Sequence, residues 1–401
     1  MSTQSPKPGW KIVKFGDVVK NANLVERDPE ANGIERVVGL EHIDPENLHI
    51  RRWNSVVDGT SFTRKFVPGQ TLFGKRRAYQ RKVAYAEFEG ICSGDILTFE
   101  PKNRKVLLPE LLPFICQSDA FFDHALGTSA GSLSPRTSWK ALKDFEFPLP
   151  PIDEQKRIAE ILWAADEAVE RYQSLLGDLE QIKEVECDIL FHDSSNLVRI
   201  QSLVDEGILF PPQDGNHGND HPKAKDYVES GIPFVMASNL TNHRLDLETC
   251  KFLPKSLTDK LRIGFSIEGD VLLSHKGTVG EVAMVPVIGT PYVMLTPQVT
   301  YYRVKDKTIL NPRFLFFSFM AKSFQRKLAR FSTQSTRAYV GITAQRQLEI
   351  PLPDIVVQDY LVEKLDAVSA EIESVRHHIA RIKALSNSYL NNMTLTGAAH
   401  V

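Results

Sequence analysis

The sequence is poor in cysteine and has no long hydrophobic run, and both features narrow the class of protein. Its four cysteines lie far apart at Cys92, Cys116, Cys187 and Cys250, without a CxxC pair. A disulfide framework and a cysteine zinc site are therefore not expected, and a reducing cytoplasm fits this usage. No apolar stretch approaches the ~18 residues of a membrane span. The polar segment Met1 to Gly9 lacks the apolar core of a secretory signal.

Catalytic and metal-binding patterns are also scarce. No GxxxxGK[ST] phosphate loop occurs, so the chain is not expected to bind ATP. Asp95, Glu100 and Lys102 loosely match a nuclease metal site, but their spacing is tight and a proline interrupts the strand. His217 and His221 have the spacing that two zinc ligands show on a helix, but the glycines and prolines around them forbid a helix. We expect a polar loop near a phosphate or a base there.

The most regular feature is a long helix that occurs twice. Each copy follows a proline-rich lead-in, Pro148-Leu149-Pro150-Pro151 or Pro351-Leu352-Pro353. Apolar residues with the same 4-3-4-3-4-3 spacing follow, and each member of the second set lies 203 residues after its counterpart. This heptad spacing predicts a narrow seam that packs on another helix, and about 40 residues give a rod of roughly 60 Å. The residues expected to form the seam or meet a partner are Gln155, Ile158, Leu162, Val169, Tyr172, Leu176, Gln358, Leu361, Leu365, Ile372, Val375 and Ile379.

The segments before the two helices also repeat each other. Gly231-Ile232 leads into Phe234-Val235-Met236 and echoes Gly33-Ile34 and Val37-Val38 at an offset of 198. The segment from Pro68 to Phe73 is echoed at an offset of 200. Phe314 to Phe331 has the pattern of an amphipathic helix. The 401 residues therefore divide into a globular domain, a helix, a second globular domain and a second helix. The expected bounds are 1–150, 151–192, 193–350 and 351–401.

Positive charge is segregated, although the formal net charge is only −2. The stretch from Thr60 to Ala86 contains no acid, and neither does the stretch from Lys307 to Leu348. A solvated face normally mixes both signs, whereas cations beside amide and aromatic side chains suit phosphate contact and readout of base edges. A donor-rich turn from Ser274 to Gly280 is a third candidate, and an ordinary hairpin is the alternative there. The predicted DNA-binding residues are Arg64, Lys65, Lys75, Arg76, Arg77, Tyr79, Gln80, Arg81, Lys82, His275, Lys276, Thr278 and Arg337.

Taken together, this plan resembles the specificity subunit of type I restriction–modification systems. The resemblance spans nearly the whole chain and rests on the Pro-Leu-Pro-Pro-x-x-Glu-Gln-x-x-Ile lead-in from Pro148 to Ile158, on its second copy and on the two divergent domains. In the second copy, Asp354 stands for the last proline and Val357 for the glutamate, while Gln358 is kept.

The resemblance implies an α+β protein. Two mixed α/β target-recognition domains in tandem duplication would each read one half of a bipartite site in double-stranded DNA. The two long helices would pair antiparallel as a coiled-coil spacer and dock two methyltransferase subunits. Translocating restriction subunits would complete the complex. S-adenosylmethionine, ATP and magnesium would belong to those partners, so that this chain is expected to be non-catalytic and to hold no cofactor or metal.

Two alternatives from other classes remain at this point. In the first alternative, the chain is a coiled-coil scaffold that joins protein partners without touching DNA. In the second, it is a nuclease that uses Asp95, Glu100 and Lys102.

Overall fold

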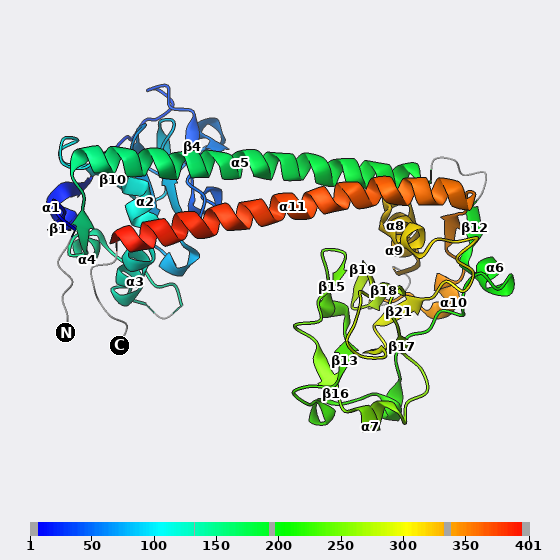
Figure 1. The fold of residues 1–401 in the computed structure, drawn as a ribbon. Coiled ribbons are helices and arrows are strands. Elements are labelled where there is room, and N and C mark those ends of the chain that lie inside the picture. The colour runs from blue at the N-terminus through cyan, green and yellow to red at the C-terminus, as the bar shows by residue number, and fades with distance from the viewer. Residues whose placement is uncertain (1–6, 132, 192–196, 333–337, 395–401) are drawn as a thin grey trace. The chain divides into compact units, whose positions relative to one another are not determined.

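The computed structural model describes residues 7–131, 133–191, 197–332 and 338–394. The chain forms two compact units, each of which combines one globular domain with parts of both long helices (Figure 1). The first unit comprises Met1–Gln173 and His377–Val401, and the second comprises Ser174–Arg376.

The two predicted long helices are confirmed. They are α5 (Ile152–Ile189) and α11 (Ile355–Thr394), of 38 and 40 residues. Each begins just after its proline-rich lead-in, where a proline can no longer interrupt the helical hydrogen bonds. Gly177 is the one glycine in α5, and α11 has neither glycine nor proline. The predicted seam residues are all buried or half-buried.

The helices run antiparallel in both units, as the resemblance implied. In the second unit Glu180 of α5 pairs with Arg376 of α11 at 2.6 Å, and Glu186 pairs with Lys364 at 2.7 Å. Residue numbers therefore rise along one helix as they fall along the other. In the first unit the rings of Tyr172 and His378 stack at 5.7 Å with an interplanar angle of 10°.

The globular part of the first unit is built on three sheets, of order β1-β11, β2-β10-β7-β8 and β3-β6-β9-β4-β5. All strand pairs are antiparallel except β4 with β9. Its elements are β1 (Lys11–Lys14), α1 (Phe15–Val18), β2 (Val19–Asn21), β3 (Leu24–Val25), β4 (Arg36–Val38), β5 (Asn54–Ser55), β6 (Arg64–Phe66), β7 (Thr71–Gly74), β8 (Val83–Tyr85), β9 (Gly90–Cys92), β10 (Ile96–Pro101), α2 (Leu112–Gln117), α3 (Asp119–Gly127), α4 (Trp139–Leu142) and β11 (Glu146–Leu149).

The globular part of the second unit contains sheets of order β12-β22, β16-β13-β20-β17, β14-β15 and β19-β18-β21. Here β13 and β20 are the parallel pair, the counterpart of β4 and β9. Its elements are β12 (Leu197–Arg199), α6 (Ile200–Asp205), β13 (Ile232–Val235), β14 (Leu240–Thr241), β15 (Arg244–Leu245), β16 (Lys251–Leu253), α7 (Lys255–Thr258), β17 (Phe265–Ser266), β18 (Val271–Lys276), β19 (Thr278–Met284), β20 (Val293–Leu295), β21 (Val299–Tyr302), α8 (Pro312–Met320), α9 (Lys322–Ser332), α10 (Ile342–Gln345) and β22 (Glu349–Pro351).

A buried glutamine at the start of each long helix shows the duplication atom by atom. Gln155 Oε1 accepts from Leu108 N at 3.0 Å, and its Nε2 donates to the carbonyls of Val106 and Pro150 at 2.7 and 2.9 Å. Gln358 makes the same three bonds 203 residues later, to the residues Asn311 (2.9 Å), Ile309 (2.8 Å) and Pro353 (2.7 Å). Both side chains therefore tie a helix to its own globular domain. This corrects the expectation that they belong to the helix seam or meet a partner.

The turns before β7 and β18 repeat at the predicted offset of 200. Gly69 and Gly269 have φ of 87° and 84°, the left-handed region that glycine tolerates best. The residue after each glycine closes its turn with a side-chain oxygen. Gln70 accepts from Val67 N at 3.1 Å, and Asp270 accepts from Ile267 N at 2.8 Å.

The first β-strand match needs a small correction. Ser93 N donates to Val38 O, and Thr296 N donates to Val235 O, both at 3.0 Å. Val38 therefore corresponds to Val235, an offset of 197 and not 198. Phe314 to Phe331 also differs from its prediction, because the chain leaves the helical conformation at Ala321 and forms α8 and α9.

Each globular domain buries apolar side chains of both long helices. In the first unit Ile158 and Leu162 of α5, with Leu390 and Met393 of α11, belong to the same buried cluster as Phe15 and its neighbours. In the second unit Cys187 at the end of α5, Leu190 and Phe191 just after it, and Val362 and Leu365 near the start of α11 join the cluster around Phe314. The start of one helix and the end of the other thus complete each core.

Ionised side chains reinforce this packing in the first unit. His49 lies between two carboxylates, with Nε2 at 2.7 Å from Asp166 of α5 and Nδ1 at 2.9 Å from Glu87. The hydrogen bond with Asp166 is the largest influence and raises the pKa of His49, against the opposing effect of burial. Arg51 adds a bond to Glu170 at 2.6 Å.

We predict that Gln155→Ala destabilises the first unit. The change leaves one backbone N–H and two carbonyls without their partner. Each such group costs about 1–3 kcal/mol when it stays buried, so the three together cost roughly 3–9 kcal/mol. Urea unfolding followed by circular dichroism measures it. Gln181→Ala, at an exposed position of α5, is the matched control and should be nearly neutral. Equal stability of the two variants would show that the three hydrogen bonds of Gln155 do not stabilise the first unit.

We also predict a pH dependence from His49. Because its pKa is raised in the folded state, its contribution is complete below the ordinary value of about 6.5 and is lost as the pH rises through the raised value. The His49→Gln change should therefore lower the melting temperature of the first unit, and this decrease should be larger at pH 6 than at pH 9. His377→Ala, an exposed histidine of α11, should show no such change. A gap that does not depend on pH would refute the role of His49.

Candidate nucleic-acid interface

The basic loop of the first domain, Lys75–Lys82, is held in place by its backbone. Arg77 and Arg81 flank a 3-10 turn (Ala78–Gln80) and both adopt left-handed backbone angles, with φ of 53° and 52°. Arg77 N donates to Pro135 O at 2.8 Å, and Thr137 N donates to Lys75 O at 3.0 Å. The loop therefore lies against the Ser/Thr-rich segment that precedes α4.

The side chains of the basic loop differ in exposure and in their ion pairs. The cation Arg77 and the neighbouring aromatic residue Tyr79 are exposed. Arg76 and Arg136 lie around one carboxylate, Asp95, at 3.7 and 3.1 Å. Lys75 is near this group, and its pKa is lowered first by burial and then by repulsion from Arg64. One carboxylate among several cations leaves local positive charge unbalanced.

Arg136 was not among the DNA-binding residues predicted from the sequence. It lies in the Ser/Thr-rich segment, outside both acid-free stretches, and only the pairing of that segment with the basic loop brings it to Asp95.

Other predicted residues of this stretch serve the fold of the domain. Arg81 binds Glu46 at 3.2 Å and Asp119 at 2.8 Å and covers the Phe122 ring at 4.6 Å. Lys82 donates to the carbonyl of Leu40 at 2.6 Å.

Two further cations are held within the domain in the same way. Lys65 pairs with Glu89 at 3.1 Å, and Arg64 donates to the carbonyls of Gly94 and Ile96. These contacts correct the expectation that the whole stretch is available to DNA, because the side chains already have partners. Gln80 is half-buried in the same turn.

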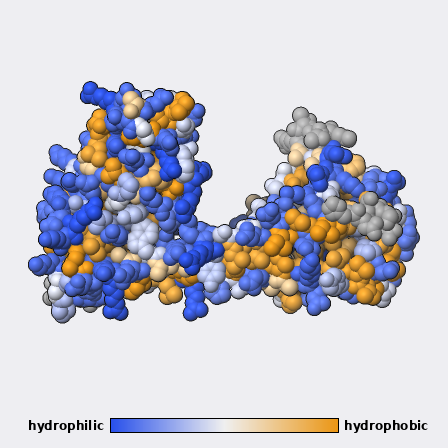
Figure 2. Space-filling view, turned by 90° about the horizontal axis from the view of Figure 1, so that it is seen from above, coloured by the Kyte–Doolittle hydropathy of each residue, from blue (hydrophilic) through white to orange (hydrophobic). Residues whose placement is uncertain are grey.

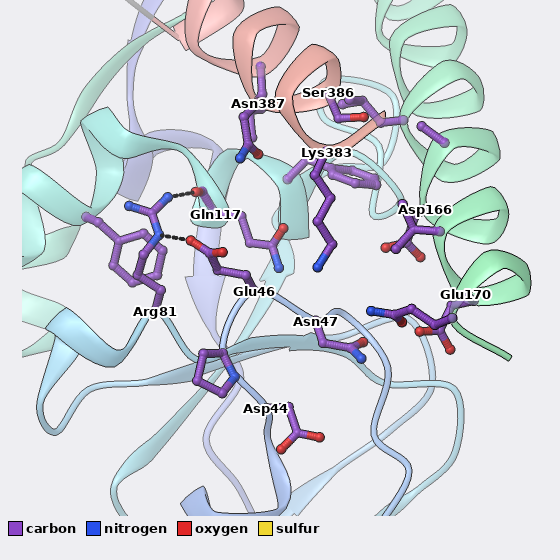
Figure 3. A pocket seen from close by; sticks show the side chains of 18 residues that line it. Asp44, Glu46, Asn47, Arg81, Gln117, Asp166, Glu170, Lys383, Ser386 and Asn387 are labelled. Carbon is purple, nitrogen blue, oxygen red and sulfur yellow. Dashed lines mark hydrogen bonds and ion pairs between the residues drawn. The ribbon is translucent and has the colours of Figure 1, made fainter. Parts of the chain in front are cut away.

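Arg81 also borders a cavity of about 330 Å³ between the first domain and both helices. Figure 3 shows Arg81 bonded to Glu46 and to the Gln117 carbonyl, while Lys383 of α11 extends toward the middle of the cavity. Asp166 and Glu170 of α5 form another wall. A cavity of about 700 Å³ lies in the corresponding place in the second unit, where Ser369 and Glu373 stand 203 residues after Asp166 and Glu170.

The second domain presents a hairpin at the place of the basic loop. β18 and β19 turn at Gly277, whose φ is 83° and which occupies the position of Arg77. Gly277 N donates to Ala338 O at 3.1 Å and Val340 N donates to His275 O at 2.9 Å, the same bonds as in the first domain. Lys276 and Thr278 are exposed at the tip, and Lys276 Nζ lies 6.0 Å from the Tyr339 ring.

His275 does not lie at the surface. Its side chain is fully buried, its Nδ1 lies 3.1 Å from Val340 O, and burial lowers its pKa. The prediction that it contacts DNA is therefore corrected. Arg337, also predicted, lies outside the described residues.

Three cations of the second acid-free stretch are paired with acids from other parts of its unit. Lys327 pairs with Glu349 of β22 at 3.1 Å, while Lys322 pairs with Glu184 of α5. Arg313 pairs with Asp366 of α11. The acids that pair with these cations lie on other elements, so the stretch contains no acid of its own although its charges are partly balanced.

The catalytic alternative finds no support in the described residues. Glu100 binds Lys20 at 2.7 Å, Lys102 donates to the Gly16 carbonyl at 2.6 Å, and Asp95 is occupied by arginines. Within residues 7–131, 133–191, 197–332 and 338–394, no group of three or more His, Cys, Asp or Glu side chains is placed to hold a metal ion.

The other sequence candidates are also resolved. His217 bonds to Asp214 at 2.8 Å, while His221 packs against Phe234 at 5.8 Å, so the two histidines do not share a ligand site. All four cysteines are buried and free. Among the described helices, none combines the length and apolar character needed to cross a membrane.

Comparisons with known proteins agree with this architecture. The family model described as "Type I restriction modification DNA specificity domain" matches residues 7–181 and 217–384. The type I restriction enzyme MjaVIII specificity subunit of Methanocaldococcus jannaschii is 22% identical over 98% of this chain and 93% of its own length.

Solved structures show the same fold. The type I restriction–modification S subunit from M. genitalium matches with a TM-score of 0.60 at 12% identity, covering 96% of both chains. A chain from a structural study of complex assembly and conformational transition of the type I R-M system matches with a TM-score of 0.59 at 20% identity, covering 97% of this chain and 98% of that one. The two family matches cover most of both globular domains and of both long helices, and the chain belongs to the family of type I restriction–modification DNA specificity subunits.

Proposed function

We propose that the two globular domains each read one half of a bipartite site in double-stranded DNA, and that the paired helices set the distance between the halves. The observation that carries the proposal is the repeated turn, Lys75–Arg77 in the first domain and His275–Gly277 in the second. Both turns are fixed by the same two backbone bonds and carry different exposed side chains. A duplicated backbone structure that carries different side chains suits two domains that each recognise a different DNA sequence.

The chemistry at each turn supports DNA as the ligand. Arg77 and Tyr79 are exposed beside a group of cations that shares a single carboxylate, Asp95. Arginine is suited both to phosphate and to the O6 and N7 atoms of guanine. In the second domain the exposed donors are Lys276 and Thr278.

The helices are the proposed contact with the methyltransferase subunits. In the second unit they expose large apolar side chains, which are Ile182, Val185 and Ile189 on α5 and Val357 and Tyr360 on α11. Figure 2 shows apolar areas among the hydrophilic surface of the chain. Exposed apolar surface of this kind marks protein interfaces. The chain itself would be non-catalytic, with S-adenosylmethionine, ATP and magnesium held by the methyltransferase and restriction subunits.

We predict that Arg77→Ala weakens DNA binding by the chain assembled with its methyltransferase subunits. Loss of one phosphate contact should make the slope of log K against log salt shallower by about 0.9. Fluorescence anisotropy with a duplex that the complex methylates measures both quantities. Lys105→Ala, an exposed lysine elsewhere in the first domain, should leave both unchanged. No DNA binding by the unaltered complex would favour a scaffold that joins proteins alone.

We further predict that lengthening both helices widens the unread gap in the target. Seven residues inserted after Gln173 in α5 and after Arg376 in α11 preserve the heptad seam and add about 10.5 Å of helix. This corresponds to about three base pairs at ~3.4 Å each. Methylation profiling reports the gap directly. An unchanged gap would show that the helices do not set the spacing, and insertion into one helix alone should abolish methylation.

A further inference from the structure

A buried carboxylate lies beside the hairpin tip of the second domain. Asp214 is only 5% exposed and precedes the 3-10 turn Gly218–Asp220. Its Oδ2 lies 2.8 Å from Nε2 of His217 and 3.7 Å from Nε2 of His275. Two imidazoles therefore share one carboxylate, one ring fully buried and the other with 56% of its side chain exposed.

His275 cannot balance the charge of Asp214 while it is neutral. Its Nδ1 faces the carbonyl of Val340, which only accepts, so Nδ1 must carry the proton. Its full burial lowers the pKa of the ring, which favours the neutral form, and Nε2 has no hydrogen-bond partner among the described residues. In the part of the chain that the structure describes, the side chain that donates to Asp214 is His217.

Among the described residues, His217 thus has a hydrogen-bond partner at only one of its two ring nitrogens. Its Nε2–H donates to Asp214, and its exposed ring leaves Nδ1 for a ligand. On the neighbouring strand β18, His275 faces the same carboxylate, and the charges that act on His275 are those of Asp214, His217 and Lys276. Lys276 is exposed at the hairpin tip that we assign to DNA. An imidazolium between a buried carboxylate and a phosphate would be stabilised from both sides.

We propose that His217 is a proton-coupled phosphate contact of the second recognition domain, with Asp214 as its positioning residue. This inference rests on the proposed function. When DNA binds, His217 takes one proton from solvent at Nδ1 and donates it in a hydrogen bond to a backbone phosphate, while Nε2–H stays bonded to Asp214. No bond other than the N–H bond forms or breaks.

The test measures DNA affinity and its salt slope at pH 6 and pH 8 for the chain assembled with its methyltransferase subunits, on a duplex that the complex methylates. The unaltered chain should bind several-fold more tightly at pH 6 than a His217→Ala variant. At pH 6 its salt slope should be steeper by up to about 0.9, the value of one phosphate contact. At pH 8 both differences should largely disappear.

Two further variants separate positioning from folding. Asp214→Asn keeps the shape of the side chain but removes its charge, so it should lose the extra affinity at pH 6 while leaving affinity at pH 8 nearly unchanged. His377→Ala, an exposed histidine on α11, should behave as the unaltered chain does. If Asp214→Asn fails to fold, His217→Ala and His217→Gln decide the matter, since His217 is exposed.

The outcomes distinguish the two proposals. A His217→Ala variant with unaltered affinity, pH response and salt slope overturns the role of His217, whereas DNA binding that still depends on Arg77 keeps the proposed function. Weakening that is equal at both pH values, with no change of slope, shows a contact without proton uptake and also overturns the inference. If the unaltered complex does not bind DNA, both proposals fall.

Discussion

The structure depends on the burial of two helix ends in each globular domain. Ile158 and Leu162 at the start of α5, and Leu390 and Met393 at the end of α11, belong to the core of the first domain. The second domain takes the end of α5 and the start of α11. Because both helices take part in both cores, neither domain completes its apolar packing without the antiparallel pairing. Gln155 and Gln358 reinforce this by bonding each helix start to buried backbone of its own domain.

This arrangement explains which parts of the two domains have diverged. Residues that bond a helix to a domain, or close the turn before β7 and β18, keep their geometry in both copies. The side chains on the turns that follow are different, as with Arg77 and Gly277. On the proposed function, the conserved packing would keep the fold the same while different side chains at the turns change the DNA sequence that is bound. His217, held by Asp214, shows that the second domain has polar contacts of its own.

The sequence predicted the architecture well because periodicity and repetition are local signals. The heptad seam, both helix starts and the duplication could all be read from it, and the offset of 203 reappears in the bonds of Gln155 and Gln358. The candidate site was predicted less well, because charge in a sequence window says nothing about partners elsewhere. Arg81 and Lys322 find carboxylates from other elements, His275 is buried by Tyr339 and Val340, and Arg136 reaches Asp95 through a loop pairing. Such contacts depend on tertiary packing.

The most direct test of the account exchanges one reader and leaves the helices intact. Residues 197–350 of this chain would be replaced by the corresponding segment of another specificity subunit, and the DNA methylated by the assembled complex would be profiled. If each domain reads its own half-site, one half of a bipartite target should change while the other half and the unread gap stay the same. A change in both halves, or an uninterrupted target, would contradict two independent readers held by a shared pair of helices.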